Sequence, residues 1–146
     1  MMSLLIHEQV VREMIADSRS LEPREAVGLL AAPTPGSPVT RCFPLPNIAT
    51  EDHLYWADPF AQWQAFRSIF QERLRPVAVY HSHPGGGTEL SARDIAFARE
   101  LGLLQVVIAL GDRVERLAAH AVDPDGSARP VEISMVISTL NPTVTS

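Results

Sequence analysis

Two histidines stand one residue apart directly after an apolar run, in the segment VAVYHSHPGGGTELSARD. Side chains two residues apart on a β-strand point to the same face, so a strand that continues through His81 and His83 would direct both imidazoles to one point. Neutral imidazole is a common ligand of metal ions, but a lone pair can also be ordinary polar residues at a strand end. The pair therefore indicates a metal site only if further ligands join it.

Asp94 is the candidate third ligand of such a site. A hydrolytic zinc ion takes three protein ligands and leaves its fourth position to water. A helix predicted over residues 91–102, with Ser91 as its N-cap and Gly102 as its stop, carries Asp94 in its first turn. The glycines 85–87 let the chain turn sharply out of the strand toward this helix. The S-x-x-D pattern of this helix start is also a capping box, and the two roles do not exclude each other.

The elements that must position these residues alternate between helices and strands. Helices are predicted from apolar spacing at 7–20, 58–74 and 91–102. Strands are predicted from length and β-branched content at 25–32, 39–45, 77–83, 103–110, 116–122 and 131–137. This order is typical of a mixed α/β fold in which about three helices pack on a central mixed sheet.

The helix predicted over 58–74 has the strongest local signals. Asp58 is a favourable N-cap, and Pro59 suits the first helical position. Four apolar residues follow one stripe along this helix: Trp63, Phe66, Phe70 and Leu74. We expect this stripe to be its apolar face.

Length and composition are typical of one globular domain. The 146 residues are 46% hydrophobic, and we expect a single domain over 1–138 followed by a disordered tail at 139–146. A formal charge of −5 without a dense run of Lys or Arg argues against a nucleic-acid partner. With Cys42 as the one cysteine no intramolecular disulfide can form, and no apolar run reaches the ~18 residues of a membrane span. These features favour a cytoplasmic protein without a membrane partner, and they carry no signal for an oligomeric state.

The segment HSHPGGGTELSARD resembles the JAMM signature of the MPN-plus zinc metalloproteases, which is His-x-His, seven residues, Ser, two residues and Asp. PREAVGLL resembles the upstream segment of that family, in which a glutamate shortly precedes a Gly-Leu pair, and this points to Glu25. The resemblance includes PNIATEDHLYWADP and extends over most of residues 4–137. It implies a cytidine-deaminase-like MPN fold of the small, stand-alone bacterial branch.

The resemblance also implies roles for five residues. His81, His83 and Asp94 would bind one zinc ion. Glu25 would take the proton of the attacking water and deliver it to the leaving amine, and Ser91 would help to stabilise the oxyanion. The implied activity is zinc-dependent hydrolysis of an amide bond after the C-terminal Gly-Gly of a ubiquitin-like or sulfur-carrier protein.

Residues near the site are candidate contacts of that Gly-Gly tail. A tail without side chains can bind in a groove as an added strand, through its main chain. The segment EDHLYW is a candidate wall of this groove, although an aromatic pair before a helix is also common in a protein core. The candidate substrate-binding residues are His53, Tyr55, Trp56 and Ser82.

Two alternatives use the same residues differently. Two histidines and one carboxylate also form the facial triad of ferrous iron enzymes, but such a site would leave Glu25 without a role. The second alternative is a catalytically silent MPN domain that only binds a ubiquitin-like partner. Metal analysis, together with hydrolysis measured with and without a chelator, distinguishes the three.

Overall fold

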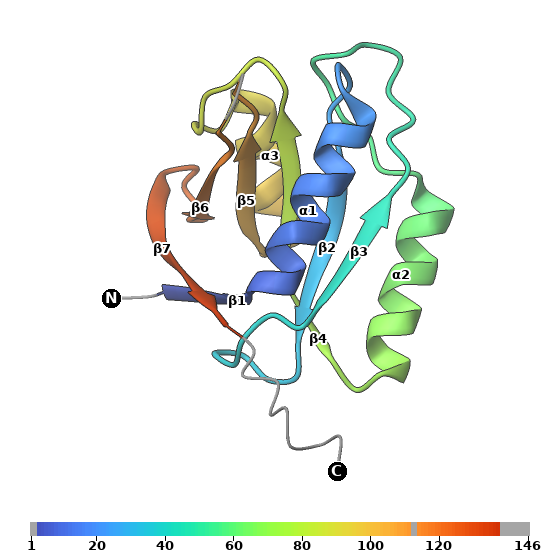
Figure 1. Cartoon of the computed structure of the whole chain (residues 1–146), viewed down its shortest axis with the longest axis vertical. Helices are drawn as coiled ribbons and strands as arrows, with labels where there is room; N and C mark the ends of the chain where they lie inside the picture. Colours follow the sequence, from blue (N-terminus) through green and yellow to red (C-terminus); the bar gives the residue numbers. More distant parts are fainter. Residues whose placement is uncertain (1–2, 112–113, 138–146) are drawn as a thin grey trace.

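The computed structural model describes residues 3–111 and 114–137, which fold as one curved sheet with helices on both faces (Figure 1). Within these residues the sheet has seven strands in the order β1-β7-β6-β5-β4-β2-β3. The strands are β1 (Ser3–His7), β2 (Val27–Ala32), β3 (Arg41–Leu45), β4 (Arg75–His83), β5 (Leu104–Ala109), β6 (Arg116–Val122) and β7 (Ala128–Val136). The helices are α1 (Glu8–Leu21), α2 (Pro59–Gln71) and α3 (Ala92–Leu101).

The predicted mixed α/β fold is confirmed. The pairs β4–β5 and β1–β7 are parallel, and the other neighbouring strands are antiparallel. Helix α3 is the connection between the parallel strands β4 and β5. The predicted tail at 139–146 lies outside the described residues, and the single-domain boundary at 138 stays a prediction.

The two edges of the sheet meet at Val39, just before β3. The backbone N–H of Val39 donates to the carbonyl of Leu5 at 2.8 Å, and the N–H of His7 donates to the carbonyl of Val39 at 3.1 Å. These bonds join β1 to the chain entering β3, so the sheet curves almost closed around α1. Strand β1 has no counterpart among the predicted strands, because five residues with the sequence SLLIH do not alternate between polar and apolar types.

The sheet separates two apolar cores. On the face toward α1, Val10 and Met14 pack among Leu30, Tyr80 and Val106. On the opposite face, side chains of α2 pack against β2 and β4, and the end of α3 contacts them. This second core includes Val27, Leu29, Ala65, Ile69, Val79 and Leu101. Because side chains alternate along a strand, the neighbours Val79 and Tyr80 of β4 face different cores.

The prediction that the apolar stripe of α2 is its buried face is wrong. The side chains of Trp63 and Phe70 are 56% and 82% exposed, whereas Ala65 and Ile69 are buried against the sheet. Phe66 is only partly buried. The smaller side chains let the helix approach the sheet closely, which a row of aromatic residues would prevent. The predicted start of α2 is confirmed, because the side chain of Asp58 caps it by accepting from the N–H of Phe60 at 3.3 Å.

Candidate metal centre

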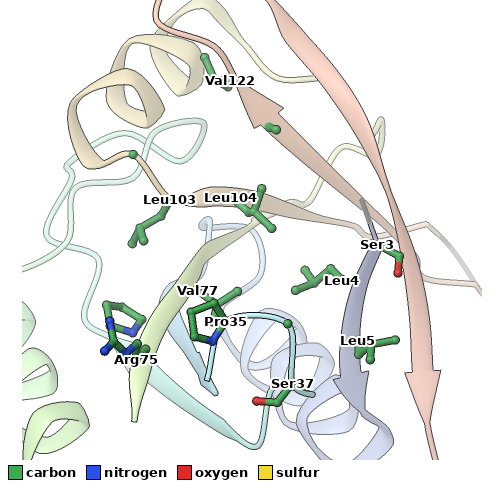
Figure 2. A pocket seen from close by; sticks show the side chains of 14 residues that line it. Ser3, Leu4, Leu5, Pro35, Ser37, Arg75, Val77, Leu103, Leu104 and Val122 are labelled. Atoms are coloured by element: carbon green, nitrogen blue, oxygen red, sulfur yellow. The ribbon is translucent and has the colours of Figure 1, made fainter. Parts of the chain in front are cut away.

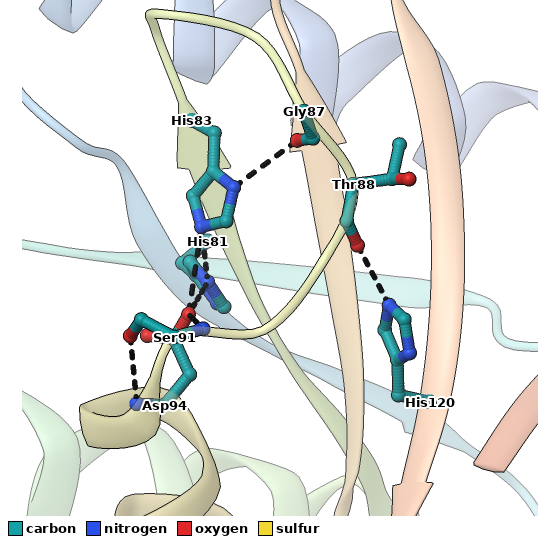
Figure 3. A network of polar contacts seen from close by, with 7 residues as sticks. All are labelled: His81, His83, Gly87, Thr88, Ser91, Asp94 and His120. Atoms are coloured by element: carbon teal, nitrogen blue, oxygen red, sulfur yellow. Dashed lines mark hydrogen bonds and ion pairs between the residues drawn. The ribbon is translucent and has the colours of Figure 1, made fainter. Parts of the chain in front are cut away.

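Three segments of the chain bring the candidate site together. His81 and His83 end β4, and Val27 of β2 lies opposite His81 in the antiparallel pairing. Glu25 lies two residues before Val27 and therefore on the same face as the histidines. The first turn of α3 places the side chain of Asp94 beside the two imidazoles (Figure 3).

Two ring nitrogens and one carboxylate oxygen form a small triangle. His81 Nε2 lies 3.1 Å from His83 Nε2 and 3.2 Å from Asp94 Oδ2, and His83 Nε2 lies 3.5 Å from the same oxygen. His81 is fully buried, and Asp94 is 5% exposed. Figure 3 shows the two imidazoles and the carboxylate turned toward one another.

This triangle fits one tetrahedral cation. Ligand bonds of ~2.0–2.2 Å at tetrahedral angles place the ligand atoms about 3.3–3.6 Å apart, close to the three distances of the triangle. Two imidazole nitrogens and a carboxylate oxygen also form a donor set that zinc and other divalent transition metals accept. A carboxylate oxygen of Glu25 also lies near the two histidines, since the three ligand atoms are all within 4.8 Å of one another. The structure therefore assembles four candidate donors, of which the triangle of His81, His83 and Asp94 is the tighter set.

Burial and hydrogen bonds with Asp94 set the protonation states of the site. Burial lowers the pKa of His81, so its imidazole is neutral and can offer a lone pair. Burial alone would raise the pKa of Asp94, but hydrogen bonds with His81 and His83 outweigh it and hold the pKa well below its usual range. The hydrogen bond to Asp94 raises the pKa of His83. The carboxylate is therefore ionised at neutral pH.

Glu25 has a different electrostatic state from Asp94. Its side chain is 7% exposed, and burial raises its pKa to about 7, with a further increase from the charge of Asp94 and partial compensation by His83 and Arg93. A carboxyl group with this pKa exchanges its proton readily near neutral pH. Two carboxylates in one site thus have separate chemical properties, one suited to binding a cation and the other to moving a proton.

The capping box at the start of α3 is present together with the triangle. Ser91 Oγ accepts from the N–H of Asp94 at 3.0 Å, while Asp94 Oδ2 accepts from the N–H of Ser91 at 2.9 Å. The hydroxyl proton of Ser91 is therefore not used by the cap. The same oxygen of Asp94 serves the cap and the triangle, so both interpretations of S-x-x-D hold in one geometry.

The glycine-rich loop is held by two imidazoles. His83 Nδ1 lies 3.1 Å from the carbonyl oxygen of Gly87, and His120 Nε2 lies 2.8 Å from that of Thr88 (Figure 3). Gly86 and Gly87 have φ values of +88° and +89°, which side chains other than hydrogen rarely permit. These contacts orient the ring of His83 and lead the chain directly to α3.

The loop before α2 forms one wall of the site. Tyr55 is 5% exposed and stacks on the ring of His81 at a centroid distance of 4.8 Å. A small cavity of about 60 Å³ lies beside it and is lined by Glu25, His53, Leu54, Tyr55, His83, Ser91, Arg93 and Asp94. Trp56 is half exposed and is not among the lining residues, but its ring contacts Arg93, which is. His53 and Tyr55 thus line the cavity, and Tyr55 mainly supports a metal-ligand candidate.

Ser82 requires a correction. It is fully buried, and its hydroxyl oxygen accepts from the N–H of Ala26 at 2.7 Å. Because side chains alternate along β4, Ser82 points to the sheet face opposite to His81 and His83. Its hydroxyl connects β4 to the chain entering β2, and it is not a contact of a substrate in the cavity.

Two residues at the site, Asn47 and Arg93, were not identified from the sequence. The side chain of Asn47 donates to the carbonyls of Glu25 at 2.8 Å and Leu54 at 3.0 Å, and accepts from the N–H groups of Ala49 and Trp56 at 2.9 Å each. It therefore connects the wall of the cavity to Glu25.

Arg93 lies in the first turn of α3, where the helix dipole disfavours a cation. This unusual position could have identified Arg93 from the sequence.

The described residues also line cavities away from the site. One of about 550 Å³ lies at the opposite end of β4, among Arg75, Val77, Leu4 and Leu104 (Figure 2). Its lining is mainly apolar and brings together no set of candidate metal ligands. The candidate metal ligands therefore lie together at the C-terminal end of β4. No helix in the described part of the chain is long and apolar enough to cross a membrane.

The fold and this donor set define an α/β domain with one candidate mononuclear metal centre. Residues 7–144 match the family described as prokaryotic homologues of the JAB domain. The chain belongs to this family, which confirms the resemblance recognised in its histidine and glutamate segments.

Curated relatives have peptidase names. A "Probable TtuB-protein conjugate cleaving protease" from Thermus thermophilus is 42% identical over 78 residues, which cover 53% of this chain and 51% of the relative, so the match spans about half of each. A "CysO-cysteine peptidase" from Mycobacterium tuberculosis is 29% identical over 132 residues, covering 89% of this chain and 90% of the relative.

Solved structures share the fold. The solution structure of a protein from Desulfitobacterium hafniense has a TM-score of 0.84 at 24% identity and covers 95% of this chain and 97% of its own. A protein from Salinibacter ruber has a TM-score of 0.62 at 22% identity, with coverage of 94% and 93%. At this identity the likeness establishes the fold alone.

Proposed function

We propose that this chain is a zinc-dependent peptidase that hydrolyses the amide bond after the C-terminal Gly-Gly of a ubiquitin-like sulfur-carrier protein. The observation that carries the proposal is the triangle of His81, His83 and Asp94 with Glu25 beside it. The peptidase names of two relatives support the reaction, and their carrier conjugates support the substrate class.

The residues of the triangle would hold the zinc ion, and Glu25 would carry protons. A zinc ion held there would lower the pKa of a bound water to about 7 and would polarise the substrate carbonyl. Glu25, with its pKa near 7, accepts the proton of the attacking water and later delivers it to the leaving amine. Amide hydrolysis needs both transfers, because an amine leaves poorly without a proton.

The surroundings of the triangle suit a narrow substrate tail. The cavity beside the triangle is small, about 60 Å³, which favours glycine over larger residues near the scissile bond. Tyr55 and Leu54 close one side of this cavity. The hydroxyl of Ser91 can donate its free proton to the carbonyl oxygen as negative charge develops there.

The proposal is tested with a ubiquitin-like carrier whose C-terminal Gly-Gly is joined to an amino acid or to a lysine side chain. We expect cleavage after Gly-Gly by protein that contains about one equivalent of zinc, loss of cleavage after chelation, and recovery with added zinc. Iron content with oxygen-dependent turnover would favour the ferrous alternative. Binding of the carrier without any cleavage, in zinc-loaded protein, would favour a silent binding domain.

Replacing Ser91 with alanine is expected to lower kcat about 100- to 1,000-fold while zinc remains bound, because one donor to the oxyanion is lost. The same change removes the N-cap of α3 and costs about 1 kcal/mol of folding stability. Hydrolysis and thermal unfolding are measured together.

Asp58→Ala is the matched control for Ser91→Ala, since it removes the cap of α2 outside the site. It should lower stability by a similar amount without the loss in kcat. Ser91→Thr keeps a hydroxyl and a cap and should retain most activity. Equal losses of kcat in the two alanine variants would show that Ser91 acts only through helix stability.

A further inference from the structure

We propose that Arg93 binds the α-carboxylate of the leaving group, so that the preferred substrate is a carrier joined to a single amino acid with a free carboxylate. This inference rests on the proposed function and specifies its substrate class. It makes Arg93 a specificity-determining residue.

Arg93 is placed at the mouth of the candidate active site. It lies between Ser91 and Asp94 in chain order and lines the same small cavity as Glu25 and His83. Its guanidinium carbon lies 5.7 Å from the centroid of the half-exposed ring of Trp56, within the range of a cation–π contact.

The guanidinium of Arg93 has no oxygen partner among the described residues. Six arginines elsewhere in the chain have a carboxylate, amide or backbone oxygen partner: Arg12, Arg19, Arg24, Arg41, Arg99 and Arg129. Arg93 forms no such contact, although its position in the first turn of α3 is electrostatically unfavourable for a cation. Arg67, Arg73, Arg75 and Arg116 also have no such partner within the described part of the chain, but of these five arginines Arg93 is the one that lines the candidate active-site cavity, where its N–H groups can meet a negatively charged ligand.

The charges around the cavity identify Arg93 as its candidate anion-binding side chain. The lining includes the carboxyl groups of Glu25 and Asp94, and Arg93 is the sole lysine or arginine among the described lining residues. With zinc held by the triangle, the ion would offset the two carboxylates, so Arg93 would supply the positive charge that a free carboxylate of the leaving amino acid can pair with.

The Gly-Gly side of the substrate offers only neutral carbonyls, and a protein lysine brings no negative charge close to the scissile nitrogen. The α-carboxylate of a single amino acid lies two bonds from that nitrogen, and its two oxygens match the paired N–H donors of a guanidinium. Charge and geometry therefore both favour an amino acid as the leaving group.

The test compares two substrates that differ in one group. A Gly-Gly-tailed ubiquitin-like carrier is joined through an α-amide either to alanine, with a free carboxylate, or to alaninamide. We expect the wild type to prefer the alanine conjugate by about 10- to 100-fold in kcat/KM, as for a charge-assisted hydrogen bond. Arg93→Gln should reduce this preference to near one, and Arg93→Lys should keep part of it because it keeps the charge without the paired donors.

Arg67→Gln is the matched control, because the guanidinium carbon of Arg67 also lies over a tryptophan, 5.6 Å from the ring centroid of Trp63, but outside the cavity. It should leave the preference unchanged. A wild type that cleaves both conjugates equally, or an Arg93→Gln variant that retains the preference, would overturn the inference. If the wild type cleaves neither conjugate, the proposed function fails, and the affinities of the two conjugates measured by calorimetry still test Arg93 separately.

Discussion

Glu25→Gln is expected to lower kcat about 100- to 10,000-fold, while the protein stays folded and retains its metal. The amide has nearly the shape of the carboxyl group but cannot accept the proton of the attacking water or return it to the leaving amine. Because the triangle of His81, His83 and Asp94 is untouched, zinc content should not change. Single-turnover hydrolysis and metal analysis of the same preparation measure both quantities.

Protein stability provides an independent test of the environment of Glu25. Its pKa in the folded protein is about 7, above the ordinary value of 4.5, because burial disfavours the charged form. The folded state thus binds more protons than the unfolded state between these values, so this group lowers the free energy of unfolding as pH rises from about 4.5 to 7.

In metal-free protein, Glu25→Gln should remove this part of the pH dependence and be more stable than the wild type at pH 8. Urea unfolding at several pH values measures the difference. A metal-free variant with the same pH dependence as the wild type would contradict the assigned environment. A variant with wild-type kcat would instead remove Glu25 from the proposed reaction.

Gly28→Ala is expected to destabilise the protein by about 3 kcal/mol through overpacking. Gly28 lies opposite Tyr80 in the pairing of β2 and β4, and a Cβ at this position would lie 2.5 Å from the ring Cζ and hydroxyl oxygen of Tyr80. The ring is fully buried, and its hydroxyl donates to Asp17 Oδ2 at 2.7 Å. It cannot move aside without losing that hydrogen bond. Thermal or urea unfolding measures the loss.

Two further variants separate this steric effect from a general cost of removing glycine. Gly85→Ala serves as the control, because a Cβ there meets nothing within 4 Å, and its stability should stay within about 0.5 kcal/mol of the wild type. Combining Gly28→Ala with Tyr80→Leu should cost less than the sum of the two single changes, since the smaller side chain vacates the space. Strict additivity would show that the ring of Tyr80 is not the cause.

The candidate site was largely predictable because its residues lie in short, chemically distinctive segments. The His-x-His pair depends only on strand alternation, and the start of α3 depends on the capping preferences of Ser91 and Asp94. Both are local properties of the chain. Glu25 could be assigned only through resemblance to a family, because a lone glutamate before a strand has no local signal that sets it apart.

Contacts between distant segments decided the rest. Strand β1 exists because β7 and Val39 pair with it, and the buried face of α2 is set by the sheet against which it packs. Ser82 was misassigned because its role depends on a hydrogen bond to Ala26, far away in sequence.

By itself the sequence determined the mixed fold, the caps of α2 and α3, and the chemical types of the candidate ligands, since each follows from neighbouring residues. Only the tertiary structure decided that three ligand atoms meet within 3.5 Å, that burial raises the pKa of Glu25, and that Arg93 remains unpaired beside them. Distance, burial and missing partners are relations between segments, and the folded chain alone establishes them.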